Sequence, residues 1–317
     1  MTSSDFPHPP TSGLWGGPTA PRTHSKEATA IKLLTLNTHS LLEEQYEEKL
    51  TWFLDMVLRE QPDVIALQEV NQTMTAPEVA PDALPGFLPI PGCAIPVRKD
   101  NHAARVAQAL HRAGIPCGWT WLPIKVGYGK YDEGAALLRL NGSITGLDAF
   151  RISRCGDYHN WKTRKVLGIR IDGRDDWFYT AHMGWWDDAD EPFAAQWSTL
   201  EGRLAFQKSA SPIWLMGDFN SPAEVRAEGY DCIRNSGWHD TYLLADDRDG
   251  GLTVAGTIDG WRSRTASPAG SGGMRIDHIW CSRPVPIRTS RVRFNGIFDR
   301  QVSDHFGVLI ETKELNV

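Results

Sequence analysis

The sequence predicts an α/β protein in which strands outnumber helices, and three observations indicate this fold class. The 317 residues include 41% hydrophobic and 23% charged residues, as expected for a globular protein that buries a sizeable core. Apolar runs at residues 31–36 and 63–67 flank one amphipathic segment and form a strand–helix–strand unit. Further apolar or alternating runs, bounded by Gly, Pro, Asp or Asn, predict strands at residues 134–139, 166–171, 177–182, 213–217, 276–280 and 306–311.

Three helices are expected between these strands. The first has a Glu-rich polar face and apolar positions that recur with helical spacing, at Tyr46, Leu50, Phe53, Leu54, Val57 and Leu58. The second runs from Asn101, a suitable N-cap, to Gly114, a typical C-terminal stop. The third follows Pro192 and carries its apolar side chains on one face, at Phe193, Trp197, Leu200 and Leu204.

One catalytic domain over residues 30–317 is expected, after a flexible arm over residues 1–29 that is rich in Pro, Ser, Thr, Gly and His. The Ser- and Gly-rich stretch 263–273 predicts a mobile loop. Five dispersed cysteines argue against a disulfide framework and against a zinc site. No apolar run is long enough to span a membrane, and residues 1–10 do not resemble a secretory signal. These features predict a cytoplasmic protein with no membrane partner.

Polar side chains gather where the apolar runs stop. The set comprises Asn37, Glu69, Asp218, Asn220, Asp277, Asp304 and His305. Strand ends share one edge of an α/β sheet, so residues far apart in sequence can converge there on a ligand. Carboxylate and amide oxygens suit a hard cation, so the set predicts a site for Mg²⁺ or Mn²⁺. Any one Asp or Asn of this set taken alone is better explained as a helix cap or a turn residue, and the metal-site interpretation depends on the set as a whole.

An ordered series of motifs runs from residue 30 to residue 312, and it resembles the endonuclease/exonuclease/phosphatase superfamily. The motifs are TLNTHS, ALQEV, TAHMGWW, MGDFNS, RIDHIW and VSDH. The resemblance implies a four-layered sandwich of two packed, mostly antiparallel mixed β-sheets flanked by helices. It also implies a phosphoric ester hydrolase that depends on a divalent metal.

The resemblance implies a role for each matching residue. Glu69 resembles the principal metal ligand, with Asn37 beside it and Asp304 completing the shell. Asp218 and Asn220 resemble the pair that orients and activates the attacking water.

Two histidines resemble donors to the scissile phosphate. His305 pairs with Asp277 in this scheme, and His182 pairs with Glu133. A carboxylate beside an imidazole favours its cationic form, so we expect both histidines to be protonated near neutral pH. Arg164 resembles a basic phosphate contact.

The chain departs from the family pattern at His39. Many nucleases of the superfamily carry an acidic residue at this position, two residues after the asparagine of the LN motif. The departure argues against a second metal ion there. His39 is interpreted either as a substrate contact or as a hydrogen-bonded loop histidine.

The substrate must be inferred from residues around the motifs, because this fold hosts many substrates. ALQEVNQ, YDEG, NWKTR and HMGWWDD resemble the bacterial subgroup that includes maltose 6'-phosphate phosphatase, which implies hydrolysis of a phosphomonoester on a sugar. Flat indole faces suit sugar rings but also stacked bases. The candidate substrate contacts are Lys162, Arg164, His39, Trp185, Trp186 and Asp187, with Asp188 and Gln196 as further donors or acceptors. Of the adjacent pair Trp185 and Trp186, at most one is expected to face the substrate.

The alternative is an Mg²⁺-dependent endonuclease or exonuclease. A net charge of -6 and the lack of a basic stripe with interleaved aromatics argue against a duplex partner. We therefore expect a small phosphorylated carbohydrate as the partner, with nucleic acid second. Arg262, Arg264 and Arg275 either close over the substrate as part of a lid or stay in solvent. The oligomeric state is not predicted.

Overall fold

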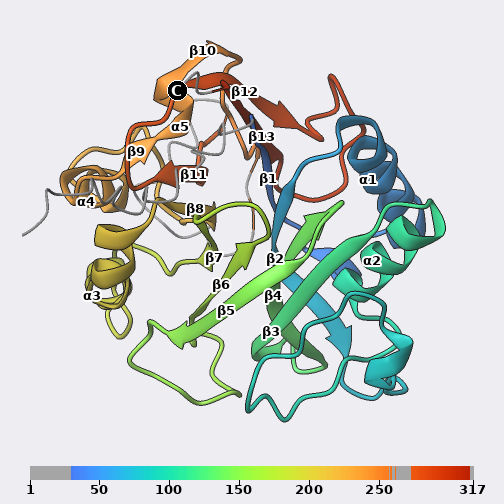
Figure 1. The fold of residues 1–317 in the computed structure, drawn as a ribbon. Helices are drawn as coiled ribbons and strands as arrows, with labels where there is room; N and C mark the ends of the chain where they lie inside the picture. The colour runs from blue at the N-terminus through green and yellow to red at the C-terminus, as the bar shows by residue number, and fades with distance from the viewer. Residues whose placement is uncertain (1–29, 257, 259–260, 262–272, 315–317) are drawn as a thin grey trace, which may run out of the picture.

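A computed structural model describes residues 30–256, 258, 261 and 273–314. The predicted N-terminal arm and residues 263–272 of the Ser- and Gly-rich stretch lie outside the described residues. The described part of the chain folds into two β-sheets with helices on both outer faces (Figure 1). None of its helices is both long enough and apolar enough to cross a membrane.

The first sheet has seven strands in the order β10-β12-β13-β1-β2-β4-β3. Pairing is antiparallel except between β1 and β2 and between β10 and β12. Its strands are β1 (Lys32–Asn37), β2 (Val64–Thr73), β3 (Cys117–Gly127), β4 (Tyr131–Leu140), β10 (Ala245–Arg248), β12 (Ile287–Arg293) and β13 (Gly307–Thr312).

The second sheet has six strands in the order β5-β6-β7-β8-β11-β9, and only β7 and β8 are parallel. Its strands are β5 (Ile144–Arg151), β6 (Lys165–Ile171), β7 (Trp177–His182), β8 (Ile213–Asp218), β9 (His239–Asp240) and β11 (Asp277–Cys281).

Five α-helices and two short 3-10 helices complete the described chain. They are η1 (Ser40–Leu42), α1 (Tyr46–Glu60), η2 (Pro81–Ala83), α2 (His102–Arg112), α3 (Phe193–Ala210), α4 (Gly229–Asn235) and α5 (Thr241–Leu244). In Figure 1, α1 and α2 cover the outer face of the seven-stranded sheet, and α3 and α4 cover the outer face of the other.

Three hydrophobic layers hold this arrangement together. On β1, Leu34 and Leu36 pack toward α1 and α2, whereas Leu33 packs into the layer between the sheets. On β8, Trp214 and Met216 enter the layer between the sheets, and the alternate residues face α3 and α4. This period of two is the geometry of a strand buried on both faces. The predicted four-layered sandwich of two mostly antiparallel mixed sheets is therefore confirmed.

The predicted helices are all present. The side chain of Asn101 accepts a hydrogen bond from the backbone N–H of Ala104 at 3.0 Å, as expected of an N-cap, and α2 ends before Gly114. The predicted apolar face of α3 is buried. All eight predicted strands form, and seven of them lie within three residues of their expected bounds. The exception is β2, which continues to Thr73, six residues beyond its predicted end.

Sequence patterning missed five strands: β3, β5, β9, β10 and β12. The strands β3 and β5 are at sheet edges, where one side of the strand has no hydrogen-bonded neighbour and residues such as proline are tolerated. Pro123 sits within β3, which an edge strand allows because its lost N–H faces no partner strand. The strand β12 holds only two apolar residues, Ile287 and Val292, among Arg, Thr and Ser, so its sequence shows no apolar alternation.

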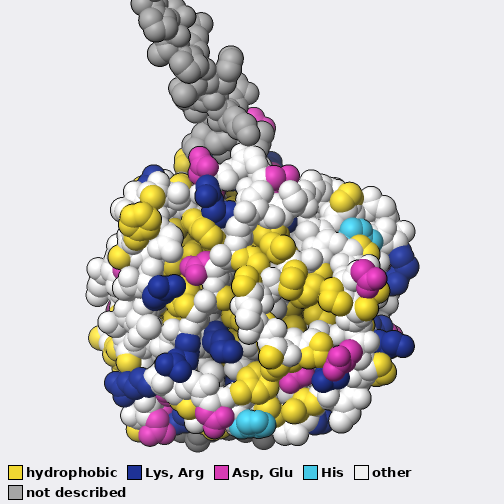
Figure 2. Space-filling model, turned by 60° about the horizontal axis from the view of Figure 1, so that its bottom comes forward, with side chains coloured by type: hydrophobic (Ala, Val, Ile, Leu, Met, Phe, Trp, Pro, Cys, Tyr) yellow, Lys and Arg dark blue, Asp and Glu magenta, His cyan; other side chains and the backbone are white. Residues whose placement is uncertain are grey.

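The face drawn in Figure 2 gathers hydrophobic side chains near its middle. Lys and Arg side chains lie in several places around them, with Asp and Glu side chains between. This face therefore carries no continuous basic surface of the kind that a nucleic acid duplex requires.

Candidate active site

Strand pairing brings three of the predicted residues side by side. His182 ends β7 opposite Asp218, which ends the parallel strand β8, and Asp277 begins the antiparallel strand β11 opposite the same Asp218. Gly217 permits the close approach of β7 and β8, because a Cβ there would lie 1.9 Å from the carbonyl oxygen of Ala181. The register of the six-stranded sheet thus fixes this row of side chains.

The seven-stranded sheet contributes Asn37 and Glu69. Asn37 ends β1, and Glu69 lies where the pairing of β2 with β4 shifts register. Glu69 has φ 51°, so a β-bulge turns its side chain away from the regular alternation. The amide nitrogen of Asn37 donates to Glu69 Oε1 at 2.9 Å and to Asp218 Oδ2 at 3.2 Å. This amide joins the two sheets at the site.

His305 is held by Asp277, as predicted. Its Nδ1 lies 3.0 Å from Asp277 Oδ2, and its Nε2 lies 3.9 Å from Asp218 Oδ2. Burial lowers the pKa of His305, but the charges of Asp277 and Asp218 outweigh it and raise that pKa well above its usual value. His305 is therefore a cation with its Nε2 turned toward Asp218.

His182 behaves differently from the prediction. Its Nε2 lies 3.6 Å from Asp218 Oδ2, and its Nδ1 lies 4.0 Å from Glu69 Oε1. Burial and the positive charges of Arg164, Lys125 and His305 hold its pKa well below the usual value. The expected pairing with Glu133 and the expected cationic form are both wrong, because cationic side chains surround this imidazole.

Glu133 pairs with Lys125 instead. Its Oε1 lies 3.1 Å from Lys125 Nζ, and both side chains are buried. The two residues are direct partners across β3 and β4, beside a register shift at Pro123 and Lys125. A Cβ on Gly127 would lie 2.6 Å from Glu133 Oε2, so the absence of a side chain there makes room for the carboxylate.

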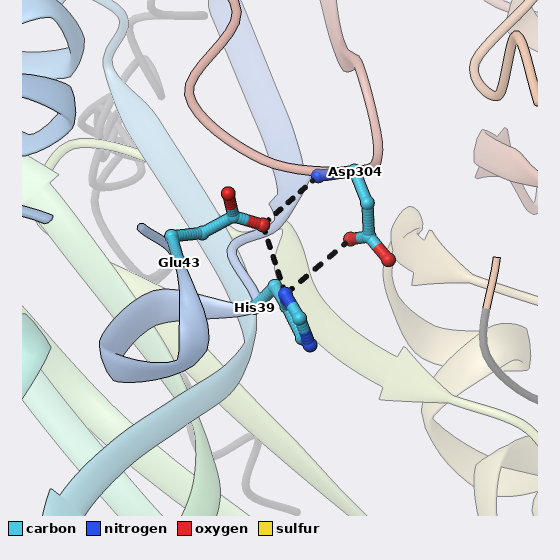
Figure 3. A group of neighbouring side chains, drawn as sticks. All are labelled: His39, Glu43 and Asp304. Carbon is cyan, nitrogen blue, oxygen red and sulfur yellow. Dashed lines mark hydrogen bonds and ion pairs between the residues drawn. The ribbon is translucent and has the colours of Figure 1, made fainter. Parts of the chain in front are cut away.

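A second group of charged side chains surrounds His39 (Figure 3). His39 Nδ1 lies 2.8 Å from Glu43 Oε1 and 3.9 Å from Asp304 Oδ1, and the same Glu43 oxygen accepts the backbone N–H of Asp304 at 3.2 Å. Burial lowers the pKa of His39, but the hydrogen bond to Glu43 and the charges of Asp304 and Glu69 raise it to about 9. Of the two interpretations of His39, the hydrogen-bonded loop histidine matches these contacts.

The donor set fits a hard divalent cation. Burial and the negative charges of Glu133 and Asp304 raise the pKa of Glu69, so the side chains of the described residues leave its ionised form short of compensating charge. A bound cation supplies that compensation. Glu69 and Asp304 carry carboxylate oxygens, a ligand type that magnesium and manganese prefer, whereas the amide oxygen of Asn37 accepts the backbone N–H of His39 at 3.3 Å. Among the described residues, two groups have possible ligand atoms within 4.8 Å of one another: His39, Glu43 and Asp304, and Asp218, Asp277 and His305.

Asp218 is the central carboxylate. Its Oδ1 accepts the backbone N–H of Asn220 at 2.8 Å. Burial and the charge of Asp277 raise its pKa, while His305 opposes that shift. Asn220, with φ 45°, donates from its amide nitrogen to the carbonyl oxygen of Met183 and accepts from the indole N–H of Trp261. The predicted Asp218–Asn220 pair is therefore a fixed local unit.

Arg164 reaches the same site from the segment before β6. It is 3% exposed, and its guanidinium donates to the carbonyl oxygens of Trp161 and Thr163 at 2.9 and 3.3 Å. Lys125 Nζ donates to the same carbonyl of Trp161 at 3.1 Å. Burial disfavours the charge of both groups and lowers the pKa of Lys125 and of Arg164. Two buried cations thus converge on one carbonyl oxygen.

These groups line one cavity of about 480 Å³. The cavity brings together ten of the predicted residues: His39, Glu69, Glu133, Arg164, His182, Trp185, Asp218, Asn220, Asp304 and His305. Asn37 and Asp277 lie behind this surface, where they hold Asp218 and His305.

Aromatic side chains form another part of the cavity wall. Trp161 and Trp185 line it with ring centroids 5.8 Å apart, and Tyr128 lies beside His39. Trp161 and Tyr128 are 51% and 54% exposed. Of the two adjacent tryptophans, Trp185 lines the cavity, whereas Trp186 packs against Phe193 of α3.

Several predicted substrate contacts do not line this cavity. Lys162 forms ion pairs with Asp188 and Asp190, and Asp187 is exposed outside the cavity lining.

Gln196 and Arg275 are also engaged elsewhere. Gln196 is buried and binds the backbone of Gly184 and Glu191. Arg275, proposed as part of a lid, is buried and bonded to Asp240; Arg262 and Arg264 lie outside the described residues. Gln196 and Lys162 therefore fasten the loop after β7 instead of presenting donors to the cavity.

Sequence reasoning missed Lys125, Tyr128 and Glu43 as parts of the site. Lys125 carried one usable signal, since it is a lone charge within the apolar run LPIKVG. Tyr128 and Glu43 carried none, because an aromatic residue in a turn and a glutamate before a helix are both common.

The sequence matches the endonuclease/exonuclease/phosphatase family over residues 34–305. The chain belongs to this family. Members of the family are hydrolases of phosphoesters, as phosphatases or nucleases, and depend on a divalent metal.

Solved structures agree with this assignment. A family protein from Leptotrichia buccalis is 29% identical, with 89% of this chain and 99% of that chain covered and a TM-score of 0.75. A mannosyl-6-phosphatase from Bacteroides thetaiotaomicron is 17% identical, with 89% and 99% covered and a TM-score of 0.56. TDP2 from Caenorhabditis elegans is 15% identical, with 90% and 76% covered and a TM-score of 0.56. The last two show a shared fold alone. A comparison with curated proteins found no match.

Proposed function

We propose that the protein is a divalent-metal-dependent phosphomonoesterase that releases inorganic phosphate from a sugar phosphate. The observation that carries the proposal is the composition of a single cavity. Its floor holds Asp218 between His182 and His305, and its wall carries Trp161 and Trp185. A cavity of about 480 Å³ is the size of a small-molecule site.

The catalytic half of the cavity supplies what phosphate ester hydrolysis requires. Asp218 orients a water molecule and accepts its proton while the water oxygen bonds to phosphorus and the ester P–O bond breaks. The proton that Asp218 has accepted passes through solvent water to the leaving sugar oxygen, which departs as a hydroxyl group. Cationic His305, fixed by Asp277, donates to a phosphoryl oxygen and stabilises the charge that develops there. Asn220 sets Asp218 in place through its backbone N–H.

Glu69, Asn37 and Asp304 are the residues that would hold Mg²⁺ or Mn²⁺. Such a cation polarises a phosphoryl oxygen and offsets the negative charge of the ester. Glu43 and His39 stand behind Asp304 and fix its backbone, so they support this ligand indirectly.

The aromatic wall favours a carbohydrate as the group attached to the phosphate. Sugar rings present apolar C–H faces that stack on indoles, and their hydroxyls suit a polar rim. The resemblance to the subgroup that includes maltose 6'-phosphate phosphatase supports this choice. The fold accommodates related chemistry, since one protein that shares it is named a mannosyl-6-phosphatase.

The proposal is tested by measuring phosphate release from phosphorylated mono- and disaccharides with Mg²⁺ or Mn²⁺, alongside nicking of supercoiled plasmid. Asp304→Ala serves as the inactive control, and Asp55→Ala, at an exposed position of α1, serves as the matched active one. We expect sugar-phosphate turnover in wild type and Asp55→Ala, none in Asp304→Ala, and intact plasmid.

Plasmid nicking without turnover of any sugar phosphate would overturn the proposal. In that case the exposed indole of Trp161 would be a platform for bases instead of sugars.

A further inference from the structure

We propose that Lys125 is the residue that makes this site selective for phosphomonoesters. With Arg164, it binds the additional anionic oxygen that a terminal phosphate carries and a phosphodiester lacks. The inference rests on the proposed function, because it names the class of ester that the same cavity accepts.

Lys125 occupies a buried position, where desolvation makes a charged side chain unfavourable unless a partner or a ligand compensates it. Its side chain is 7% exposed, lines the cavity, and reaches Glu133 Oε1 at 3.1 Å and the Trp161 carbonyl oxygen at 3.1 Å. A buried ion pair is often no more stabilising than a well-packed apolar pair of the same volume. Structure alone therefore does not explain why β3 places a lysine here.

Arg164 shows that the neighbouring positive charge has room for a ligand. Its guanidinium donates to two backbone carbonyl oxygens and forms no ion pair among the described residues. Its Nε is buried and has no hydrogen-bond partner within the described part of the chain. A guanidinium has five donors in a planar fork that fits phosphate oxygens, so an anion in the cavity would satisfy this arginine.

The charges on the two sides of the cavity are opposite. One side carries Glu69, Asp218 and Asp304, where a divalent cation and the attacking water belong. The other side carries Lys125 and Arg164, and among the described residues only Glu133 offsets their charge by an ion pair. The second side is net positive.

A phosphomonoester is a dianion near neutral pH, whereas a diester is a monoanion. The additional negative charge of the monoester lies on the oxygen that carries the second alkyl group in a diester. Lys125 and Arg164, anchored together on the Trp161 carbonyl, provide a pair of cationic donors for that terminal group. A diester would place an alkyl group against these donors and leave one of them unpaired, which disfavours it.

The experiment compares hydrolysis of 4-nitrophenyl phosphate and bis(4-nitrophenyl) phosphate, which share a leaving group, in the metal-supplemented full-length protein. Lys125→Met is expected to lower kcat/KM for the monoester by about 10- to 100-fold, the usual range for a lost charged hydrogen bond. The diester rate should change less than about threefold. Lys165→Met is the matched control, because Lys165 donates to the carbonyl oxygen of Pro123 and does not line the cavity.

Removing Lys125 leaves Glu133 buried without its partner, so the single variant is paired with the charge-neutral Lys125→Met/Glu133→Gln. Thermal melts identify which variant folds, and the substrate ratio is read from that one. Equal losses on both esters, or no loss on either, would refute a selective role for Lys125 and leave the proposed function standing.

Failure of the proposed function has a different signature. If wild type turns over the diester only, the phosphomonoesterase proposal is wrong. Titration with inorganic phosphate then decides the inference: a dissociation constant raised at least about tenfold in the Lys125 variant supports the two-cation site, and an unchanged constant refutes it.

Discussion

The two halves of the cavity are built by different means. The catalytic half, with His182, Asp218 and Asp277, is set by strand register and by a hydrogen bond that joins both sheets. The substrate half comes from the edge strand β3 and from the segment before β6, and its Tyr128 and Trp161 are more than half exposed. Chemistry is therefore placed on the rigid centre of the fold, and recognition on its periphery.

The difference predicts how each half responds to mutation. Side chains in the catalytic half are held by several partners, so conservative changes there should remove chemistry and leave the fold intact. Under the proposed function, side chains in the substrate half would contact the ligand and take no part in the chemical step, so changes there should weaken binding and leave that step nearly unchanged.

The largest effect is expected for Asp218→Asn. The asparagine amide keeps the shape of the side chain, and its oxygen can still accept the backbone N–H of Asn220. It cannot accept the proton of the attacking water, so kcat should fall by about 1,000-fold or more. Steady-state kinetics and a thermal melt measure the two consequences. Asp176→Asn is the matched control, since Asp176 is a buried aspartate that accepts from the indole of Trp214 away from the cavity.

We expect Asp176→Asn to lower the melting temperature and leave kcat unchanged, and Asp218→Asn to lower kcat and leave the melting temperature unchanged. This result would show that Asp176 is buried for stability and Asp218 for catalysis. Turnover within tenfold of wild type in Asp218→Asn would exclude it as the proton acceptor.

A smaller loss is expected for Asp277→Asn. Asp277 contacts the substrate only through His305, whose Nδ1 lies 3.0 Å from its Oδ2. Weakening that support should lower kcat by about 100-fold with KM nearly constant, because His305 still reaches the phosphate but is less firmly oriented and less cationic. A rate equal to wild type in a folded variant would remove Asp277 from the scheme.

The same division explains what could be predicted from the sequence. Asn37, Glu69, Asp218, Asp277 and His305 follow apolar runs, and the register of buried strands brings such positions together. Sequence patterning therefore predicted the strand-rich α/β fold and the convergence of these side chains, whereas the four-layered sandwich and the place of His182 came from the resemblance to the family. It did not locate the bulge at Glu69, whose φ of 51° depends on how β2 pairs with β4.

The substrate half was harder to predict because edge strands and loops carry weak patterns. The strand β3 went unrecognised owing to Pro123, and Lys125 with it. Glu133 was assigned to His182 by motif, but its neighbour across the sheet is Lys125, a pairing that follows only from the register of β3 and β4. Lys162 was assigned to substrate on charge alone, whereas Asp188 and Asp190 occupy it.

In the substrate half, Trp161→Ala should raise KM for the best sugar phosphate by about tenfold with little change in kcat. The expected cause is loss of the stacking face, and glycerol phosphate, which has no ring, should show no such change. Phe206→Ala provides the control, since Phe206 is 80% exposed on α3 and does not line the cavity. Equal losses for the ring and ring-free substrates would mean that Trp161 supports the phosphate site and not the sugar.

The smallest effect is expected for Lys162→Met. Lys162 Nζ bonds Asp188 Oδ1 at 2.9 Å and Asp190 Oδ2 at 2.6 Å, which ties the segment carrying Trp161 to the loop carrying Trp185. Exposed ion pairs contribute little, so KM should rise by only about threefold. Sodium chloride screens such pairs, and the gap in KM between wild type and variant should therefore narrow as salt is added.

A gap that persists at high salt would mean that Lys162 acts through its methylene packing on the Trp161 ring, where its Nζ lies 5.4 Å from the ring centroid. If wild type and Lys162→Met have the same KM at every salt concentration, the position of Trp161 is set by backbone hydrogen bonds of its own segment, such as that from Thr163 N to Asn160 O at 3.0 Å. The substrate half would then be as firmly held by local turns as the catalytic half is by strands, and the contrast between the two would reduce to exposure alone.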